Sequence, residues 1–418
     1  MLDMFGESRQ QRGLEIAAVS KIERKGTAWL VPSQSGKGRY TVIPDDEAPH
    51  CSCPDHADGG HKCKHLFAVE YVLRREKNAD GSTTVTETMT VQKTVQRVYR
   101  QDWRAYNAAQ THEKAKFQEL LRDLCSGITE PPQAKCGRPR LRMQDALFSA
   151  VFKIYSTVSG RRFMTDLREA QVKGYIQKTP HFNSIFNYLE NPALTPILRQ
   201  LITESSLPLK AVEVDFACDS SGFTTSRFHR WFDHKYGAVR QEHEWVKVHL
   251  MCGVRTNIVT AVEIKDKNAS DTKLLPALVD ATAENFTLNE VSADKGYGSL
   301  KNYKAVQYHG ATPYIAFKST HTGRGAGLWQ KMFHYYNFNR DQFLQHYHKR
   351  SNVESTFSMI KAKFRDHVRS KTDVAMVNEV LCKILCHNIC CLIQESYELG
   401  ISAVFWAETS PAQKQVLN

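Results

Sequence analysis

The stretch AVEVDFACD, residues 211–219, marks the point at which the apolar pattern of this sequence changes period. Before Pro208 the apolar residues recur at helical spacing, whereas from residue 211 onward they alternate or cluster as they do in β-strands. Three strands are predicted in this part of the chain, over residues 211–219, 246–254 and 258–264. The last two are close enough in sequence to form a hairpin.

Helices and strands alternate after these three strands. The pattern predicts a helix, a strand, a second helix and a further strand, followed by long helices; the first four elements cover residues 273–280, 288–293, 300–307 and 313–317. The order βββαβαβα predicts an α/β fold of the ribonuclease H-like kind, with a mixed sheet flanked by helices. Because one fold hosts many functions, the chemistry must be argued from particular side chains.

Two aspartates follow predicted strands. Asp219 ends the first strand and precedes Ser220-Ser221-Gly222-Phe223, a run that favours a turn and an exposed carboxylate. Asp294 lies in VSADKGY, residues 291–297, again where a strand meets a glycine-containing turn. Asp215 is an alternative to Asp219, because residues four apart on a strand point to the same face. The strand-end position favours Asp219 as a metal ligand, and an ordinary turn or capping role is the alternative for Asp294.

The stretch YHKRSNVESTFSMIK, residues 347–361, places a third acid on a predicted helix. At about 100° per residue, four of its side chains fall within an arc of roughly 60° on one helical face: Tyr347, Arg350, Glu354 and Lys361. Such a face can direct a carboxylate toward a metal ion while the other three side chains contact a phosphate backbone. A solvated stripe held by intrahelical salt bridges is the alternative interpretation.

Three acids gathered in this way would suit metal-dependent cutting of DNA. In-line displacement at a phosphodiester uses two divalent ions about 3.5 to 4 Å apart, one at the attacking oxygen and one at the leaving oxygen. Carboxylates from adjacent strands and a facing helix supply the hard oxygen ligands that such ions require. We therefore predict that Asp219, Asp294 and Glu354 are catalytic and bind two Mg²⁺ or Mn²⁺ ions per active site.

These residues resemble those of the insertion-sequence DDE transposases. The pattern Tyr347-x2-Arg350-x3-Glu354-x6-Lys361 matches the Y-R-E-K pattern of one large group of these enzymes without a change in spacing. The resemblance covers about residues 211–393 and includes the regions around the first acid, the helix before the second acid, and the second acid, at residues 214–223, 267–278 and 293–297. It implies a ribonuclease H-like core that nicks transposon ends and joins the 3′ hydroxyl to target DNA, with Tyr347, Arg350 and Lys361 contacting DNA.

The resemblance also implies a homodimer or higher oligomer, because two transposon ends must be held together. The interval between Asp294 and Glu354 leaves little room for the β insertion of some relatives, which argues against base flipping by Trp329. Two other functions are alternatives: a nuclease of the same fold that only hydrolyses DNA, and a non-catalytic DNA-binding protein descended from a transposase. The second alternative predicts a missing acid, and none is missing.

A cluster of metal-binding residue types lies near the N-terminus. The pattern C-x-C-x9-C-x-H supplies four zinc donors: Cys51, Cys53, Cys63 and His65. A predicted hairpin precedes the cluster and a predicted helix follows it, which makes a small ββα module with elements at residues 27–31, 39–42 and 66–72. The spacing resembles the SWIM zinc finger over about residues 27–72. Four protein ligands leave no position for a reactive water, so the Zn²⁺ is predicted to be structural. Chance clustering is one alternative, and three nearby histidines are competing donors: His50, His56 and His61.

The domain prediction follows from these patterns. The chain is predicted to begin with a SWIM-type module at residues 1–77, followed by a linker with a helix at 78–140 and a helical DNA-binding region at 141–208. The catalytic domain follows at 209–400 and a tail at 401–418. The helical region has a size that suits a helix-turn-helix DNA reader. Six residues after the first strand could line the DNA path or cap the sheet edge: Arg227, His229, Arg230, Trp231, Lys235 and Arg240. Gly137-Arg138-Pro139-Arg140 resembles a minor-groove hook, although an interdomain linker is the simpler interpretation.

Composition and charge favour a folded protein with a polyanionic partner. Lys and Arg number 56 against 44 Asp and Glu, giving a formal net charge of +12, which points to DNA. No run of about 18 apolar residues occurs and residues 1–12 are polar, so we expect no membrane segment and no secretory signal. Several of the 11 cysteines lie in apolar segments, which indicates reduced thiols. We expect a cytoplasmic, nucleoid-associated protein of a prokaryote.

Overall fold

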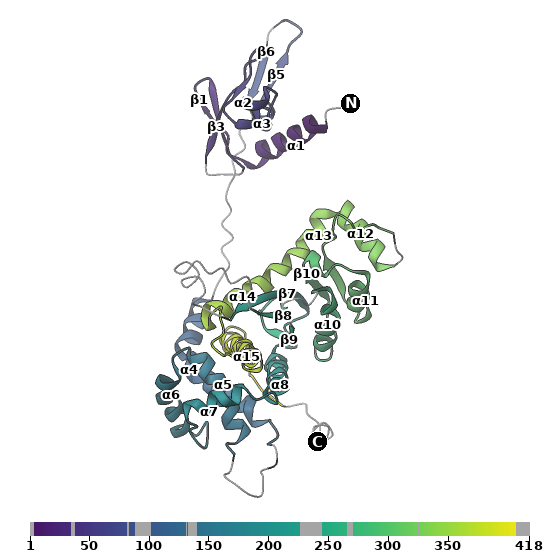
Figure 1. Ribbon diagram of the computed structural model, residues 1–418. Coiled ribbons are helices and arrows are strands. Elements are labelled where there is room, and N and C mark those ends of the chain that lie inside the picture. The colour runs from purple at the N-terminus through teal and green to yellow at the C-terminus, as the bar shows by residue number, and fades with distance from the viewer. Residues whose placement is uncertain are drawn as a thin grey trace. The chain divides into compact units, whose positions relative to one another are not determined.

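The computed structural model describes residues 4–34, 38–81, 83–87, 102–130, 132, 140–225, 245–265, 271–324 and 327–406. The chain divides into two compact units, Met1–Arg100 and Gln101–Asn418, which are described separately (Figure 1). The first unit therefore extends beyond the predicted boundary after residue 77. Strand β5, Leu73–Lys77, pairs antiparallel with β6, Thr83–Glu87. Part of residues 78–91, for which the sequence leaves a linker and a weak edge strand open, is therefore a strand. β-branched threonines favour this extended conformation.

The first unit is built on an antiparallel sheet with the order β1-β2-β3-β4. Its other elements are α1, Met4–Val19, α2, Pro54–Gly59, α3, Lys64–Val72, β1, Glu23–Lys25, β2, Ala28–Pro32, β3, Arg39–Ile43, and β4, His50–Cys51. The predicted hairpin and helix are confirmed as β2, β3 and α3. The core between sheet and helices contains Trp29, Val31, Val42, Leu66 and Val69.

The predicted ββα module is incomplete, because α1, β1 and β4 were not predicted. Two of these are strands of two or three residues, too short to show a period, and α1 is mostly polar. Helix α1 nevertheless packs on α3 through the buried side chain of Ile16. The two helices approach so closely that a Cβ atom on Gly13 would lie 2.5 Å from the Cβ atom of Phe67, which explains the glycine at this position.

The second unit contains a five-stranded mixed sheet and the remaining helices. Its helices are α4, Trp103–Ser126, α5, Met143–Ser156, α6, Gly160–Val172, α7, Phe182–Leu189, α8, Leu194–Ser206, α10, Leu275–Ala283, α11, Leu300–Tyr308, α12, Leu328–Phe338, α13, Arg340–Tyr347, α14, Ser351–Phe364, and α15, Asp373–Glu398. Four short 3-10 turns are η1, Leu207–Leu209, η2, Asp271–Lys273, η3, Lys295–Tyr297, and η4, His348–Arg350. The strands are β7, Asp215–Thr224, β8, Trp245–Gly253, β9, Val259–Lys265, β10, Glu290–Ala293, and β11, Thr312–Ile315.

The strands of this sheet lie in the order β11-β10-β7-β8-β9. Strands β7, β8 and β9 are antiparallel neighbours, whereas β10 pairs parallel to both β7 and β11. The predicted element order and the mixed sheet flanked by helices are confirmed. This arrangement is consistent with a ribonuclease H-like core.

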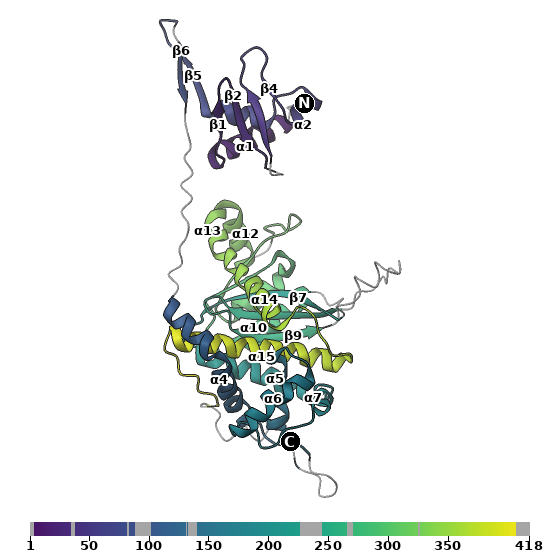
Figure 2. The same ribbon diagram turned by 90° about the vertical axis from the view of Figure 1, so that its left-hand side faces the viewer.

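Helices cover both faces of the sheet (Figure 2). Phe216 and Cys218 of β7 point to the face covered by α10 and α11, and Ala217 and Phe223 point to the opposite face, covered by α14 and α15. The alternation along β7 therefore assigns its odd-numbered residues, including Asp219, to the side of α14.

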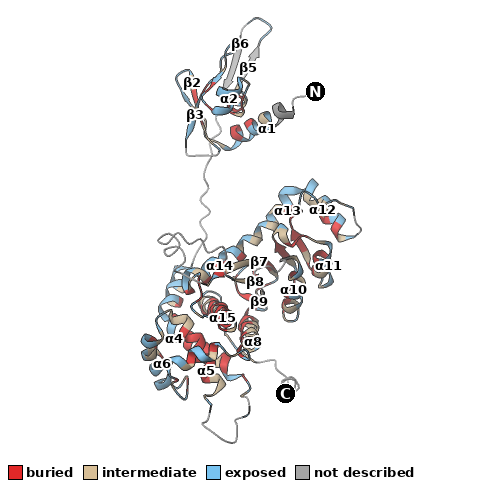
Figure 3. Cartoon of the chain, in the orientation of Figure 1, coloured by how far each residue is buried: buried red, intermediate tan, exposed pale blue. Residues whose placement is uncertain are grey.

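The helical block before the sheet is not a separate domain. Its apolar residues share one core with α14, α15 and the sheet, and Figure 3 shows α5 and α15 as largely buried. Helical periodicity shows which face of a helix is apolar but not what covers it, so this shared core could not be foreseen. The DNA-binding role of the helices over residues 141–208 stays a prediction. Helix α15 is long and apolar enough to cross a membrane by length and composition, but 89% of its most apolar window is buried inside the unit, as in a core helix.

Candidate active site and metal centre

Strand pairing places two of the predicted acids next to each other. In the parallel pair of β7 and β10, Cys218 lies opposite Ala293. Asp219 and Asp294 are the next residue on each chain segment, just after the parallel pairing ends. Because the two segments run parallel, both aspartates lie at the same edge of the pair.

The predicted turn after Asp219 is absent. Strand β7 continues through Ser220, Ser221 and Gly222 to Thr224, because each of these residues pairs with a residue of β8. The Ser-Ser-Gly run suggested a turn from local preference alone, and the long antiparallel partner outweighs that preference. Asp219 is thus a mid-strand residue at the point where only the parallel pairing with β10 has ended.

Arg350 connects the first and third acids. Its Nη1 atom lies 3.2 Å from Oδ2 of Asp219 and 2.5 Å from Oε1 of Glu354. The hydroxyl of Tyr347 lies 3.4 Å from Oδ1 of Asp294. The structure therefore brings the three predicted acids together around one guanidinium and one phenol.

The predicted single helix is divided into α13, η4 and α14. Tyr347 ends α13 and Arg350 ends the 3-10 turn. A 3-10 turn has about 3.0 residues per turn, so side chains three apart align more closely than in an α-helix. The common face expected for Tyr347, Arg350 and Glu354 is therefore preserved across the change of helix type.

The carboxyl group of Asp219 has a pKa above its ordinary value. Burial raises the pKa of this carboxyl, the nearby charges of Asp294 and Glu354 raise it further, and the Ser220 N–H and Arg350 act against them. The N–H of Ser220 donates to Oδ1 of Asp219 at 2.8 Å. A half-buried carboxylate among like charges gains most from a cation that neutralises the group.

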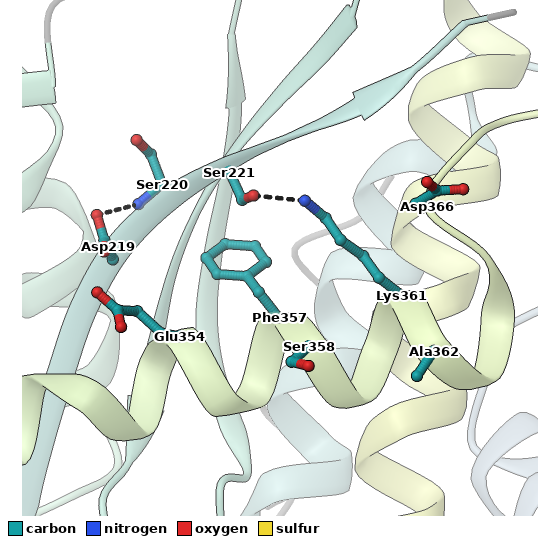
Figure 4. A pocket seen from close by; sticks show the side chains of 9 residues that line it. All are labelled: Asp219, Ser220, Ser221, Glu354, Phe357, Ser358, Lys361, Ala362 and Asp366. Atoms are coloured by element: carbon teal, nitrogen blue, oxygen red, sulfur yellow. Dashed lines mark hydrogen bonds between the residues drawn. The ribbon is translucent and has the colours of Figure 1, made fainter. Parts of the chain in front are cut away.

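A cleft of about 560 Å³ opens beside α14 next to these acids (Figure 4). It is lined by Asp219, Ser220, Ser221, Glu354, Phe357, Ser358, Lys361, Ala362 and Asp366. Lys361 Nζ donates to Oγ of Ser221 at 2.6 Å, and burial lowers the pKa of this amine. The cleft therefore has Asp219 and Glu354 at one end and, at its amine end, Lys361 with the carboxylate of Asp366 nearby.

The alternative acid, Asp215, has another role in the structure. Its Oδ2 accepts from Lys349 Nζ at 2.7 Å, and the same amine contacts Glu290 Oε2 at 2.7 Å. His346 contacts the other oxygen of Glu290 at 2.8 Å. This network fastens η4 to the starts of β7 and β10. The sequence did not indicate it, because nothing in the local pattern connects Lys349 with acids more than 50 positions away.

Some predicted DNA contacts lie outside the described residues. These are Gly137, Arg138, Pro139, Arg227, His229, Arg230, Trp231, Lys235 and Arg240. Trp329 is described and is 8% exposed, packed against Tyr303 and Phe317 with its Nε1 donating to the Thr322 carbonyl. A tryptophan held in the core in this way is not available to contact a flipped base.

The four predicted zinc ligands come together in the first unit. Their ligand atoms all lie within 4.8 Å of one another and all four residues are buried: Cys51, Cys53, Cys63 and His65. Nδ1 of His65 lies 3.9 Å from the sulfur atoms of both Cys51 and Cys63, while its Nε2 has no hydrogen-bond partner among the described residues. Ligands around a tetrahedral zinc ion, with bonds of about 2.0 to 2.3 Å, lie about 3.3 to 3.8 Å apart, so the cluster is compatible with such a site.

The competing histidines are engaged elsewhere. His56 contacts the His61 carbonyl at 2.8 Å, and His61 contacts Asp55 at 3.0 Å. The ring of His50 lies 5.7 Å from that of His56 between centroids, tilted by 40°. None of the three belongs to the cluster of potential metal ligands found among the described residues.

The charge state of the thiols also fits a cation. Hydrogen bonding with Cys51 lowers the pKa of the Cys63 thiol, and the same interaction raises the pKa of Cys51. Burial raises the pKa of Cys53. Zinc binds cysteine as thiolate, so a bound cation would offset the cost of ionising the buried Cys51 and Cys53 thiols.

The comparisons with known proteins bear on the second unit. Residues 210–389 match the family model described as a transposase DDE domain, a range that includes Asp219, Asp294 and Glu354. The match supports a transposase of the DDE type and implies DNA as the partner. The search of curated proteins found no match to this chain.

Proposed function

We propose that this protein is a DNA transposase that nicks transposon ends and joins the 3′ hydroxyl to target DNA, with Asp219, Asp294 and Glu354 as catalytic acids. One observation carries the proposal: carboxylates from β7, from the end of β10 and from α14 meet around Arg350 and Tyr347. They do so inside the region that matches the transposase domain. We place the chain in the Y-R-E-K group, because the four residues of that pattern line one site and its cleft.

The donor set fits hard divalent ions. Three carboxylates, one of them with its charge disfavoured by burial, supply oxygen ligands of the kind that Mg²⁺ and Mn²⁺ prefer. Bound there, two such ions would activate the attacking oxygen and stabilise the leaving oxygen of the phosphodiester. Asp219, Asp294 and Glu354 would hold them.

The basic and phenolic side chains would position the DNA. Arg350 can exchange its carboxylate partners for a phosphate oxygen, which its planar guanidinium binds in two-point fashion. Lys361 faces the cleft beyond the acids and would contact the next phosphate along the strand. Tyr347 would orient Asp294 through its hydroxyl. Because two transposon ends react together, we further propose that the chain acts as a homodimer or larger assembly.

The first unit would bind one structural Zn²⁺ through Cys51, Cys53, Cys63 and His65, in a SWIM-type module. All four positions are filled by protein atoms, which leaves none for a reactive water. We assign this unit a role in presenting a DNA- or protein-binding surface and no part in the chemistry.

A strand-transfer assay tests the catalytic proposal. A donor duplex carrying the inverted repeats that flank the coding region, pre-cut to a 3′ hydroxyl, is incubated with a plasmid target and Mn²⁺. Asp219→Asn, Asp294→Asn and Glu354→Gln should each abolish joining while DNA binding stays near the wild-type level. Asp166→Asn is the control, since it makes the same change at an acid of the same unit that pairs with Lys114 and contacts none of the three acids or Arg350.

Two results would decide against parts of the proposal. Normal joining by any of the three acid variants removes that residue from the site. Hydrolysis of the donor by the wild type without any joined product favours the alternative of a nuclease that only hydrolyses, and neither cleavage nor joining favours a non-catalytic DNA-binding protein.

A further inference from the structure

One segment of the second unit carries positive charge without negative charge. Residues 295–340, here called the basic segment, contain no Asp or Glu, although a stretch of this length would ordinarily hold about five at the chain's average of 44 acids in 418 residues. The basic segment contains seven basic side chains: Lys295, Lys301, Lys304, Lys318, Arg324, Lys331 and Arg340. The two acids that border it are Asp294, in the candidate active site, and Asp341.

These seven side chains are free to meet a partner. All seven residues are exposed, and none forms an ion pair with an acid in the part of the chain that the structure describes. Some basic residues elsewhere in the same unit are paired with acids: Lys114 with Asp166, and Lys363 with Glu113. An ordinary solvated surface mixes both signs of charge, so seven unpaired cations in sequence point to an anionic partner.

A rigid aromatic layer supports the basic segment. Trp329 of α12 contacts Tyr303 of α11 at 5.0 Å and Phe317 at 4.9 Å between ring centroids, and Tyr336 of α12 contacts Phe343 of α13 at 5.1 Å. The three helices are thus joined through their inner faces, and their basic side chains are left on the outside.

Two aromatic side chains on the same segment are exposed. Tyr308 at the end of α11 is 85% exposed and Phe338 at the end of α12 is 78% exposed. Arg340 follows Phe338 closely and lies over the Tyr336 ring at 5.2 Å. Cations interleaved with exposed rings are typical of surfaces that bind nucleic acid, where the rings pack on sugars or bases.

The basic segment and the cleft lie on opposite sides of the acids. Lys295 follows Asp294 directly, and α13 leads into Tyr347. Figure 1 shows α11, α12 and α13 at one end of α14, whereas the other end of α14 reaches α4, which Lys363 contacts through Glu113. The amine end of the cleft, at Lys361, faces that second end.

We propose that the basic segment is a second DNA-binding surface, which holds the phosphate backbone of duplex DNA on the side of the catalytic acids opposite the Lys361 cleft. This inference rests on the proposed function for its choice of partner. The contacts are expected to be independent of base sequence, because exposed lysines and arginines on α11, α12 and α13 would meet phosphates. The bound duplex is either the DNA flanking the transposon end or the target DNA.

Salt-dependent binding tests the surface directly. The full chain is titrated with a short mixed-sequence duplex over a range of salt concentrations, for the wild type and for a variant with one substitution on each helix: Lys304→Ala, Lys331→Ala and Arg340→Ala. Losing three phosphate contacts should make the negative slope of log K against log salt shallower by about three units and weaken binding on the order of 10- to 100-fold. A control variant carries the same charge change on other elements: Arg104→Ala, Lys210→Ala and Lys371→Ala. Its slope should become shallower by less than about one unit.

The outcomes separate this inference from the proposed function. An unchanged slope in the helix variant, or an equal loss in the control variant, overturns the surface. If the helix variant shows the smaller salt dependence but the wild-type protein neither cuts nor joins DNA, the DNA-binding surface is supported and the transposase function is not. If the helix variant still cuts donor ends but fails to join them to a plasmid, the surface holds target DNA; if cutting and joining fall together, it holds the flank of the transposon end.

Discussion

Arg350 and Asp219 lie on elements 131 positions apart and meet at 3.2 Å between Nη1 and Oδ2. The same Nη1 atom contacts Glu354, four residues further along the chain. One cation therefore holds the first and third acids together before any metal ion arrives. Without it, the half-buried carboxylate of Asp219 and the exposed carboxylate of Glu354 would repel each other across the site.

We expect that Arg350→Ala shifts the acidic limb of the pH–activity profile to higher pH. The guanidinium is one of the groups that act against the burial-raised pKa of Asp219, so its removal raises that pKa further and keeps the carboxyl protonated to a higher pH. The rate at the optimum should also fall on the order of 100-fold, because a cation aimed at the reacting phosphate is lost. Cleavage rates with Mn²⁺ across a pH series measure both effects.

Arg350→Lys is the matched control for this prediction. A lysine keeps the charge but not the two-point geometry, so the acidic limb should stay near its wild-type position while the rate still falls. An acidic limb that does not move in Arg350→Ala would show that this cation does not govern the protonation of Asp219.

The larger part of the second unit could be predicted from the sequence, since period-two patterning in strands and one-sided helices leave strong local signals. Spacing within short windows predicts the order of strands and helices and the shared helical face of Tyr347 and Glu354. It also predicts the two aspartates that follow the paired residues of β7 and β10. These are properties that the chain displays locally, before tertiary contacts form.

What could not be predicted depends on partners distant in sequence. β7 runs on past Asp219 because β8 pairs with it, and no window around Ser220 contains that information. The helical block is part of one core with α15 for the same reason. Lys349 shows no signal of its own, because its partners Asp215 and Glu290 reach it only through the fold.

The zinc site gives a prediction about the first unit alone. Cys63→Ser should lose one equivalent of zinc and lower the thermal stability of that unit, since structural zinc contributes directly to folding. The second unit should melt as in the wild type, because it is a separate compact unit. His61→Ala is the control, as this neighbouring histidine binds Asp55 and lies outside the cluster. Elemental analysis and calorimetry give both answers, and full zinc content in Cys63→Ser would remove that ligand.

Glu395 gives a prediction about stability and pH. Burial, aided by Glu398, raises its pKa from the ordinary 4.5 to about 7 near the end of α15. The folded state therefore holds this proton more tightly than the unfolded chain. The contribution of Glu395 to stability is fully present below about pH 4.5 and is lost as the pH rises through about 7. Glu395→Gln should raise the free energy of unfolding by about 1 kcal/mol at pH 8, allowing for partial solvent access, and change it little at pH 4. Urea unfolding at the two pH values is the measurement, and an equal gain at both would show that ionisation is not the cause.

Lys349 is expected to stabilise the segment that carries the active-site residues. Its amine is 2.7 Å from both Asp215 and Glu290, with only 30% of its side chain exposed, so Lys349→Met leaves two half-buried carboxylates without their cation. The free energy of unfolding should fall by about 1 to 3 kcal/mol. Because Lys349 lies in η4 between Tyr347 and Arg350, DNA cleavage should fall too, even under conditions where the variant is fully folded.

Two further variants separate charge from packing at this position. Lys349→Arg should recover most of the stability and activity, since it keeps a cation within reach of both acids. Adding Asp215→Asn and Glu290→Gln to Lys349→Met should recover stability, because no unpaired charge remains, yet not the cleavage rate, because η4 is no longer held by an ion pair to the two strands. Recovery of both stability and cleavage in that triple variant would mean that the network only balances charge and does not position Arg350.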